Sequence, residues 1–521
     1  MKVQFSVTIF FLFIANFSLC EEFKSSDFEN IICLKGKCIG VRDLGEQIEI
    51  ETYDRQSNSS ENLKYPFYSK KEKSLFQRKG GRFISAKVWG DCIYFFFRFE
   101  SDKNKKWEIF SKVYEINTGQ FHSDAKLLFV QNQLRSGELE FYDIHVFQNE
   151  KYLFFGANNN DGGNVLRMRY EVLFFDKNLN SIDSLKTDYK FGAQIFPAEY
   201  HDNLEGDFAI LLRQKKNLIK RHLREYFYFD TEEIYTLYTW KENLKNNLSV
   251  KFESSSAFVK LMSPFILSNG DVGVVGTYRN VVPENYKTQG VHGVEYYLFK
   301  GDQLELERTN RVRIEDLSEG QLINDWKKTH EHEFSNRDQN ETLKSRYEPE
   351  FEESVGAMVS TAHDLLPAHF DYLNGKLIGC FRVGDIIPSL VTRNTSTGGH
   401  ASHLQVNYYL RKSIVMEFIG NSYKFHGGVT GNQIAAYTGD RNYVTLRFSL
   451  GDIVVSDEGW HIYQLNGNNA IIIAKLNSDL EIVEYVHQLG DNTVDTFTDF
   501  GNISSLLQFL NYRKPKVNSK K

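Results

Sequence analysis

Short runs of aromatic and β-branched residues, separated by small polar turns, recur along most of the chain. Clear examples are Asp91–Glu100, Tyr152–Gly156, Ala209–Arg213, Val272–Tyr278 and Tyr443–Leu450. Apolar runs of this length, ended by Gly, Asn or Asp, are typical of β-strands closed by turns. Helical periodicity is sustained in two places and predicts short helices over Asn217–Arg224 and Glu315–Lys328. The pattern therefore predicts an all-β protein with few short helices.

One hairpin pattern returns six times: a strand rich in Tyr and Phe, a small polar turn, and a second strand. The copies start at Lys112, Tyr170, Ile234, Val294, Val406 and Ala470. Successive starts are 58, 64, 60, 112 and 64 residues apart, and two more short strands precede most copies. Three or four strands in each such unit are typical of a propeller blade. We therefore predict a β-propeller-like fold with six or seven blades; the alternative is a pair of β-sandwich domains.

The N-terminus has the pattern of a signal peptide. Lys2 precedes an apolar run over Val3–Phe17, and Ser18 and Cys20 supply small side chains for cleavage after Cys20. The apolar run is short for a membrane-spanning helix, and Leu19 does not fit a lipid-attachment motif at Cys20. Cleavage is therefore expected over a membrane anchor or a lipid anchor. The mature protein is expected in the periplasm, at the cell surface or outside the cell, with no transmembrane segment.

The rest of the chain divides into three parts. We predict an N-terminal segment over residues 21–79, a propeller-like domain over 80–512 and a basic tail over 513–521. A charged stretch at 327–353 carries 5 basic and 8 acidic residues and interrupts the repeat, so it is predicted to be a solvated insertion.

Four cysteines remain after removal of the signal peptide. Cys33 and Cys38 flank a turn containing Gly36, and in an exported protein this spacing predicts a Cys33–Cys38 disulfide. Two free thiols are the alternative, and the pairing of Cys92 and Cys380 is left open. A single C-x4-C pair without further ligands nearby does not indicate a zinc finger.

Charge and motifs exclude several functions. With 62 basic and 68 acidic residues the net charge is −6, which argues against a nucleic-acid partner. No G-x-S-x-G or H-E-x-x-H motif is present, and the calcium-like run from Asp176 has Ser181 where an EF-hand needs glycine. The sequence therefore favours a binding protein over an enzyme and predicts no cofactor.

Histidines supply the weak candidates for a metal site. His400 and His403 lie three apart in the segment Ser396–His403, which is expected to be a Gly-rich loop, and His363 or His369 could add a third ligand. Solvated loop histidines are the alternative. The pairs Tyr296-Tyr297 and Tyr408-Tyr409 are candidates for sugar stacking, with core packing as the alternative for most of them.

The segment Asn269–Glu307 and the closing hairpins FFDKNLNSIDSLK and AKLNSDLEIVEY resemble uncharacterised exported propeller-like proteins of Bacteroidetes-type bacteria. The resemblance extends over most of residues 80–515. It implies a propeller-like fold and a place in the envelope or outside the cell, and it carries over no functional residue. The charged insertion and the C-x4-C hairpin depart from that pattern.

Two functions follow as hypotheses. The first is an exported β-propeller scaffold that binds another envelope or extracellular component, either protein or glycan. The alternative is a glycan-binding module or carbohydrate-active enzyme at the central mouth of the propeller, which would require paired carboxylates there. A calcium-dependent adhesin is a third possibility with less support.

Overall fold

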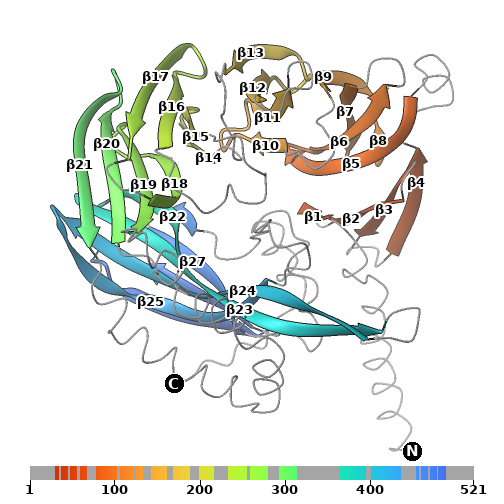
Figure 1. Ribbon diagram of the computed structural model, residues 1–521. Helices are drawn as coiled ribbons and strands as arrows, with labels where there is room; N and C mark the ends of the chain where they lie inside the picture. The colour runs from red at the N-terminus through yellow and green to blue at the C-terminus, as the bar shows by residue number, and fades with distance from the viewer. Residues whose placement is uncertain are drawn as a thin grey trace, which may run out of the picture.

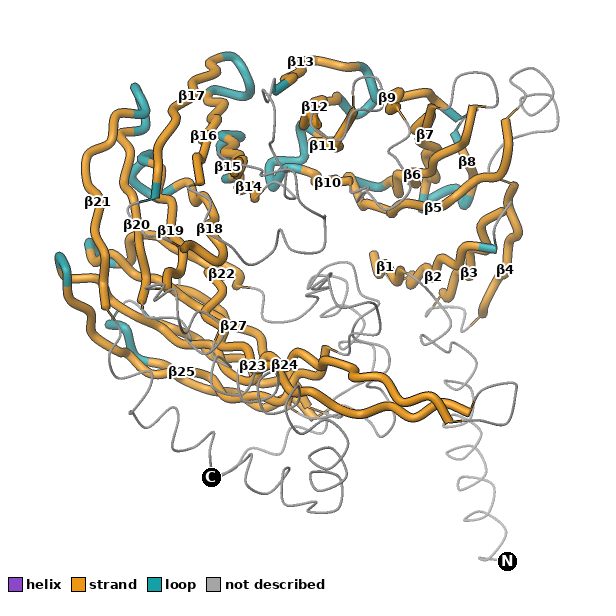
Figure 2. The backbone as a smooth tube through the Cα atoms, viewed as in Figure 1, coloured by secondary structure: helices purple, strands orange, loops and turns teal. Residues whose placement is uncertain are grey.

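The computed structural model describes the backbone of most predicted strands. The described residues are 30–34, 37–44, 47–54, 59–66, 78–101, 106–122, 125–132, 142–160, 168–187, 199–215, 233–254, 258–279, 293–313, 364–394, 400–435, 453–456, 459–466, 470–477 and 479–488. The signal peptide, the charged insertion, the basic tail and both predicted helices lie outside these residues. Within them there is no helix, and short turns join one strand to the next (Figure 2).

Seven antiparallel sheets follow one another along the described chain. The first is β1 (Asn30–Leu34), β2 (Lys37–Asp43), β3 (Gln47–Asp54) and β4 (Ser59–Pro66). The second is β5 (Arg78–Trp89), β6 (Cys92–Ser101), β7 (Lys106–Glu115) and β8 (Gln120–Phe121), with β9 (Lys126–Asn132) also paired to β7. The third is β10 (Tyr142–Val146), β11 (Leu153–Asn160), β12 (Met168–Phe175) and β13 (Ser181–Lys186).

The remaining four sheets repeat the same order of strands. They are β14 (Glu199–Asp202), β15 (Phe208–Lys215), β16 (Glu233–Lys241) and β17 (Asn246–Glu253); β18 (Phe258–Ile266), β19 (Val272–Arg279), β20 (Gly293–Lys300) and β21 (Glu305–Arg313); β22 (Asp364–Leu373), β23 (Lys376–Asn394), β24 (His400–Ile419) and β25 (Ser422–Ala435); and β26 (Ile453–Ser456), β27 (Gly459–Asn466), β28 (Ala470–Leu476) and β29 (Ile482–Gln488).

The sheets are arranged around a ring, with β1, β10, β14, β18 and β22 nearest its middle and β4, β13, β17, β21 and β25 at its outside (Figure 1). Apolar side chains fill the space between neighbouring sheets. Phe147, Phe154 and Phe208, for example, belong to one core shared by sheets β10–β13 and β14–β17. Five such cores join the first six sheets in series, each sheet to its neighbour. The fold is therefore all-β and propeller-like, as the sequence predicts.

The six predicted hairpins are confirmed as the third and fourth strands of their sheets. They are β7–β8, β12–β13, β16–β17, β20–β21, β24–β25 and β28–β29. The N-terminal segment adds a further sheet, whose Ile39 and Ile50 share a core with Phe83 and Phe95 of the next sheet. The predicted boundary at residue 80 falls inside β5, which begins at Arg78. The N-terminal segment is therefore packed as another blade-like unit.

Candidate functional site

The inner strands of three successive sheets, and of the sheet β22–β25, place ionisable side chains near the middle of the ring. Lys87 comes from β5, Asp143 from β10, Glu199 from β14 and His369 from β22. The first three side chains are half-buried and His369 is buried. Ionisable groups with so little water around them change their pKa or acquire specific partners. We refer to Lys87, Asp143 and Glu199 as the central cluster.

Asp143 is held by a tyrosine from two strands away. The buried hydroxyl of Tyr170 on β12 donates a hydrogen bond to Oδ2 of Asp143 on β10. The tyrosine ring passes over Gly156 of β11, where an added Cβ would lie 2.7 Å from ring carbon Cζ. A hydrogen bond donated to a carboxylate stabilises its charged form. Glycine at 156 is thus needed for this contact, and the contact favours ionised Asp143.

The backbone of Tyr170 is fixed as well. Its N–H donates to Oγ1 of Thr187 at 3.0 Å, and its carbonyl accepts from the same hydroxyl at 2.9 Å. Both residues are buried. This reciprocal pair holds the start of β12 just beyond the end of β13, so the Tyr170 side chain is directed by the sheet and does not depend on a loop.

Glu199 is a carboxylate whose pKa is raised well above its usual range. Its pKa is raised from 4.5 to about 8, mainly by burial and also by the negative charge of Asp143, while a hydrogen bond from Ser263 and the cation of Arg213 act in the opposite direction. Glu199 therefore holds its proton at neutral pH. Two carboxyl groups that interact but sit in different environments can act as a proton donor and a charged partner.

Lys87 completes the cluster from the neighbouring sheet. Burial lowers the pKa of its ammonium group, and the carboxylate of Asp143 partly offsets that effect. The anion that acts on Lys87 is Asp143, the same carboxylate that accepts the hydrogen bond from Tyr170.

Tyr200 follows Glu199 on β14. Burial raises the pKa of its hydroxyl, and the charges of Asp143 and Glu199 raise it as well.

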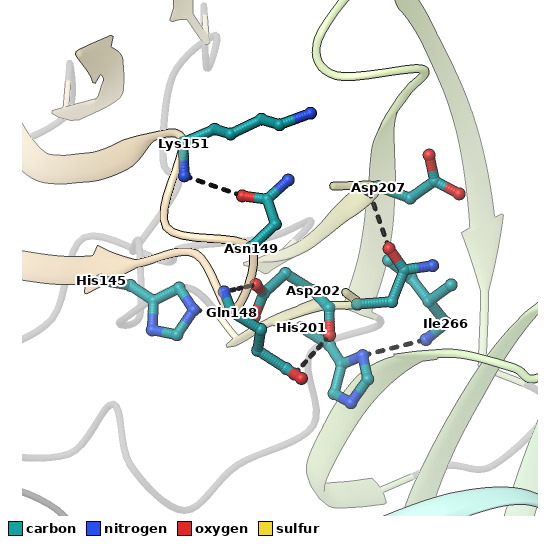
Figure 3. Close-up of polar contacts among 9 residues, drawn as sticks. His145, Gln148, Asn149, Lys151, His201, Asp202, Asp207 and Ile266 are labelled. Carbon is teal, nitrogen blue, oxygen red and sulfur yellow. Dashed lines mark hydrogen bonds and ion pairs between the residues drawn. The ribbon is translucent and has the colours of Figure 1, made fainter. Parts of the chain in front are cut away.

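Two neutral histidines lie beside the cluster. The pKa of His201 is lowered to about 4, mainly by burial, with Asp202 acting to raise it and His145 to lower it. The pKa of His369 is lowered to about 3 by burial and by His201. Their ring centroids are 6.1 Å apart. Nδ1 of His201 accepts the backbone N–H of Ile266 at 3.2 Å (Figure 3), which puts the ring proton on Nε2.

Asp202, the last residue of β14, joins this strand to the preceding sheet. Its carboxylate accepts the backbone N–H of Gln148 at 2.5 Å and contacts Nε2 of His145 at 2.8 Å. The side chain of Gln148 donates in return to the carbonyl of Asp202 at 2.8 Å. Asp202 is buried, and Figure 3 shows the whole group between the two sheets. These bonds fix the end of the strand that carries Glu199.

The structure places the backbone of two predicted metal candidates, His400 and His403. The prediction of a loop at His400 and His403 is wrong, because both lie in β24, opposite Asn394 and Val391 of β23. Positions three apart on a strand belong to opposite faces of a sheet. The side chains of both residues lie outside the described part, as does all of His363. His369 lies beside His201, and the described side chains contain no group of three metal-ligating residues.

The cysteines are partly placed. Cys33 and Cys38 are register partners in the β1–β2 hairpin. Paired positions in antiparallel strands have Cα atoms about 4.5–5.5 Å apart, within the range that a disulfide spans. Their side chains lie outside the described part, so the disulfide stays a prediction. Cys92 is a half-buried free thiol, and Cys380 is buried.

Two other sequence features serve the fold. Asp176 accepts backbone N–H groups of Asn178 and Asn180 at 2.9 and 2.8 Å, and the ammonium of Lys126 lies on the same turn, 2.8 Å from Oδ1 of Asn180. This is a hydrogen-bonded hairpin turn. Tyr296 and Tyr297 are buried in separate apolar cores. The alternative of core packing is therefore correct for this pair, while the side chains of Tyr408 and Tyr409 lie outside the described part.

Asp143 and Glu199 were missed by the sequence analysis. They lie 56 positions apart and belong to no motif. A signal was nevertheless present, because the short inner strands YDIHV and EYHD carry ionisable residues where neighbouring strands are apolar.

Among the described residues, no helix is long and apolar enough to cross a membrane.

Comparison with known proteins adds little to this geometry. No protein-family model and no curated protein sequence matches the chain. Among solved structures, an arabinanase of Bacillus subtilis is 8% identical over 48% of this chain and 89% of its own, with a TM-score of 0.24. A polysaccharide lyase is 9% identical over 78% and 90%, with a TM-score of 0.31. An acylaminoacyl peptidase of Pyrococcus horikoshii is 9% identical over 88% of this chain and 57% of its own, with a TM-score of 0.29. Similarity at this level does not bear on function.

Proposed function

We propose that this protein cleaves a glycan at the middle of the ring, with Glu199 as the proton donor and Asp143 as its ionised partner. The observation that carries the proposal is the pairing itself: two carboxyl groups from neighbouring inner strands interact, one protonated at neutral pH and one held in its charged form by Tyr170. Glycoside hydrolysis needs one acid and one carboxylate at the scissile bond.

The chemistry follows from the two environments. Glu199 gives its proton to the glycosidic oxygen as the bond from that oxygen to the sugar carbon breaks, so the leaving group departs as an alcohol. The charge of Asp143 stabilises the positive charge that develops on the sugar ring in the transition state. A water molecule then supplies the hydroxyl for the sugar carbon, and its proton restores the acid.

A cleavage assay tests the proposal. The purified full chain would be incubated with a panel of neutral and acidic polysaccharides, and new reducing ends would be measured. We expect release from at least one polymer and a loss of about 100-fold or more in Glu199→Gln, which keeps the shape of the side chain but has no proton of suitable acidity. Glu205→Gln is the matched control, since Glu205 is exposed in the turn after β14. Equal activity in the two variants, or release from no polymer, would refute the proposal.

The scaffold hypothesis from the sequence stays a prediction. It requires a partner surface but no chemistry, and the described contacts do not single out such a surface. Export likewise stays a prediction, because residues 1–20 lie outside the described part. A glycan-active protein at the cell surface or outside the cell would meet its substrate there, so the two predictions are compatible.

A further inference from the structure

A row of cations lines one side of the central cluster. Arg82 and Lys87 lie on β5, opposite Arg98 and Tyr94 of β6. A register shift between Phe83 and Ser85 brings both positions to the same face of the sheet, although they are an odd number of residues apart. Tyr94 is part of the core between this sheet and β10–β13. The face that carries Arg82 and Lys87 is therefore the one turned toward sheet β10–β13, whose Tyr142 and Ile144 belong to the same core.

The contacts of Tyr142 place the arginines at the start of β10. The guanidinium of Arg98 lies 3.4 Å from the Tyr142 hydroxyl and 4.4 Å from the centroid of the Trp107 ring. The charges of Arg98 and Arg82 both act to lower the pKa of Tyr142, against the larger effect of burial. Arg82 and Arg98 thus bring positive charge to Tyr142, the residue that precedes Asp143 in β10.

One carboxylate, Asp143, acts on the cation of Lys87. It already accepts from Tyr170 and interacts with Glu199, which is uncharged at neutral pH. Lys87 is half-buried, and a desolvated ammonium gains from a second anion close by. The planar guanidinium fork of Arg82, which is exposed, matches the two oxygens of a carboxylate or sulfate. The hydroxyls of a neutral sugar can accept hydrogen bonds from these side chains, but an anionic group gains the stronger, charge-assisted bond.

We propose that the glycan bound at the central cluster is anionic, and that Arg82 and Lys87 bind the carboxylate of a uronic acid or the sulfate of a sulfated sugar. This inference rests on the proposed function for the position of the glycan, and it adds the substrate class. Anchoring of the acidic group on β5 places the neighbouring glycosidic bond toward Asp143 of β10 and Glu199 of β14, in the order in which the inner strands follow one another.

Binding measurements on the full chain carrying Glu199→Gln test the inference without turnover. The probes are three polymers of matched length: polygalacturonate, dextran sulfate and dextran. We expect an anionic polymer to bind at least tenfold more tightly than dextran, and the preferred one identifies the acidic group. Arg82→Gln and Lys87→Gln should each weaken that binding by about tenfold, the loss of one charge-assisted hydrogen bond. Lys87→Arg, which keeps the charge, should retain more of the affinity.

The control is Lys251→Gln, a lysine exposed on the outermost strand β17, which should leave the affinity unchanged. Dextran binding as tightly as both anionic polymers, or Arg82→Gln and Lys87→Gln having no more effect than the control, would overturn the inference. The two proposals fail separately. Tight, Arg82-dependent binding of an anionic polymer that is never cleaved refutes hydrolysis alone, while cleavage of neutral polymers alone refutes the anionic substrate.

Discussion

The hydroxyl of Tyr170 reaches Asp143 across an entire strand, over the bare Cα of Gly156. Asp143 and Gly156 are register partners in β10 and β11, and Tyr170 belongs to the next strand. A polar contact of this length requires a large side chain on one strand and no side chain on the strand between. The Asp143 carboxylate is therefore held in place because Gly156 has no Cβ that would block the Tyr170 side chain.

The substitution Gly156→Ala tests this relationship. The added Cβ would overlap the Tyr170 hydroxyl and lie 2.7 Å from Cζ, so the ring must shift and its bond to Asp143 must break. Overpacking of this kind costs about 1–3 kcal/mol, and we expect that loss in the free energy of unfolding measured with urea. In a Tyr170→Phe background part of the overlap is gone, so a double-mutant cycle should show a smaller cost of Gly156→Ala. Additive costs would contradict the contact.

Tyr170→Phe alone separates the hydroxyl from the ring. Loss of the hydrogen bond destabilises the charged form of Asp143 and raises the pKa of that carboxyl group. We expect the acid limb of the pH–activity profile to move to higher pH, with a stability loss of about 1 kcal/mol. A profile that keeps its shape, with only a uniform fall in rate, would mean that Tyr170 has a packing role alone.

Glu199 should make the protein less stable as pH rises. Its folded-state pKa, about 8, is above the ordinary value of 4.5, so the stability it contributes is present below pH 4.5 and is lost as pH rises toward 8. One such group changes the free energy of unfolding by at most about 1.4 kcal/mol per pH unit. Between pH 6.5 and 8, the free energy of unfolding measured with urea should fall less steeply in Glu199→Gln than in wild type. Identical slopes in Glu199→Gln and in the exposed control Glu205→Gln would contradict the assignment.

The two buried histidines should act in the opposite direction. The pKa of His201, about 4, and of His369, about 3, lie below 6.5, so their contribution is present above pH 6.5 and is lost as pH falls. We expect His369→Gln to reduce the loss of stability between pH 6.5 and 4.5. His122→Gln, a change at an exposed histidine, is the control. The assignment fails if both variants lose stability on acidification as steeply as wild type.

Removal of the Asp202 carboxylate should lower the free energy of unfolding more than removal of the Asp207 carboxylate, which follows the adjoining turn. Asp202→Ala removes the buried carboxylate that accepts from the backbone N–H of Gln148 and contacts the ring of His145, a cost of about 3 kcal/mol. Asp207 accepts an exposed bond from the Glu242 backbone at 3.1 Å, so Asp207→Ala should cost under about 1 kcal/mol. Equal midpoints of urea denaturation in the two variants would show that the Asp202 contacts do not stabilise the junction between sheets.

The sequence predicted the fold because each hairpin carries its own signal. The turn at Asn117–Gly119 and the run after Asp176 are local features, and the strands beside them alternate or are apolar enough to be recognised. The N-terminal sheet was harder to predict, because its strand β4 (SSENLKYP) is polar and its packing partners belong to the next sheet. Long-range packing decided that case.

The candidate site could not be predicted from the sequence for a geometric reason. Lys87 precedes Asp143 by 56 positions and Glu199 follows it by 56. Only the ring of sheets brings their strands together. The histidines illustrate the same limit. His369 was considered with His400 and His403 because of their spacing, whereas the fold places it beside His201, 168 residues earlier. Proximity in a ring of sheets is set by the order of the inner strands and not by spacing along the chain.

The most direct test of the account is the pH dependence of kcat/KM on whichever polysaccharide the protein cleaves. This profile reports the pKa of the essential acid in the free enzyme. If Glu199 is the proton donor, kcat/KM should be sustained through neutral pH and fall as pH rises through about 8, the value set by burial and by Asp143. A profile that falls near pH 4.5, as for a solvated glutamate, or one that is level beyond pH 8, would contradict the account.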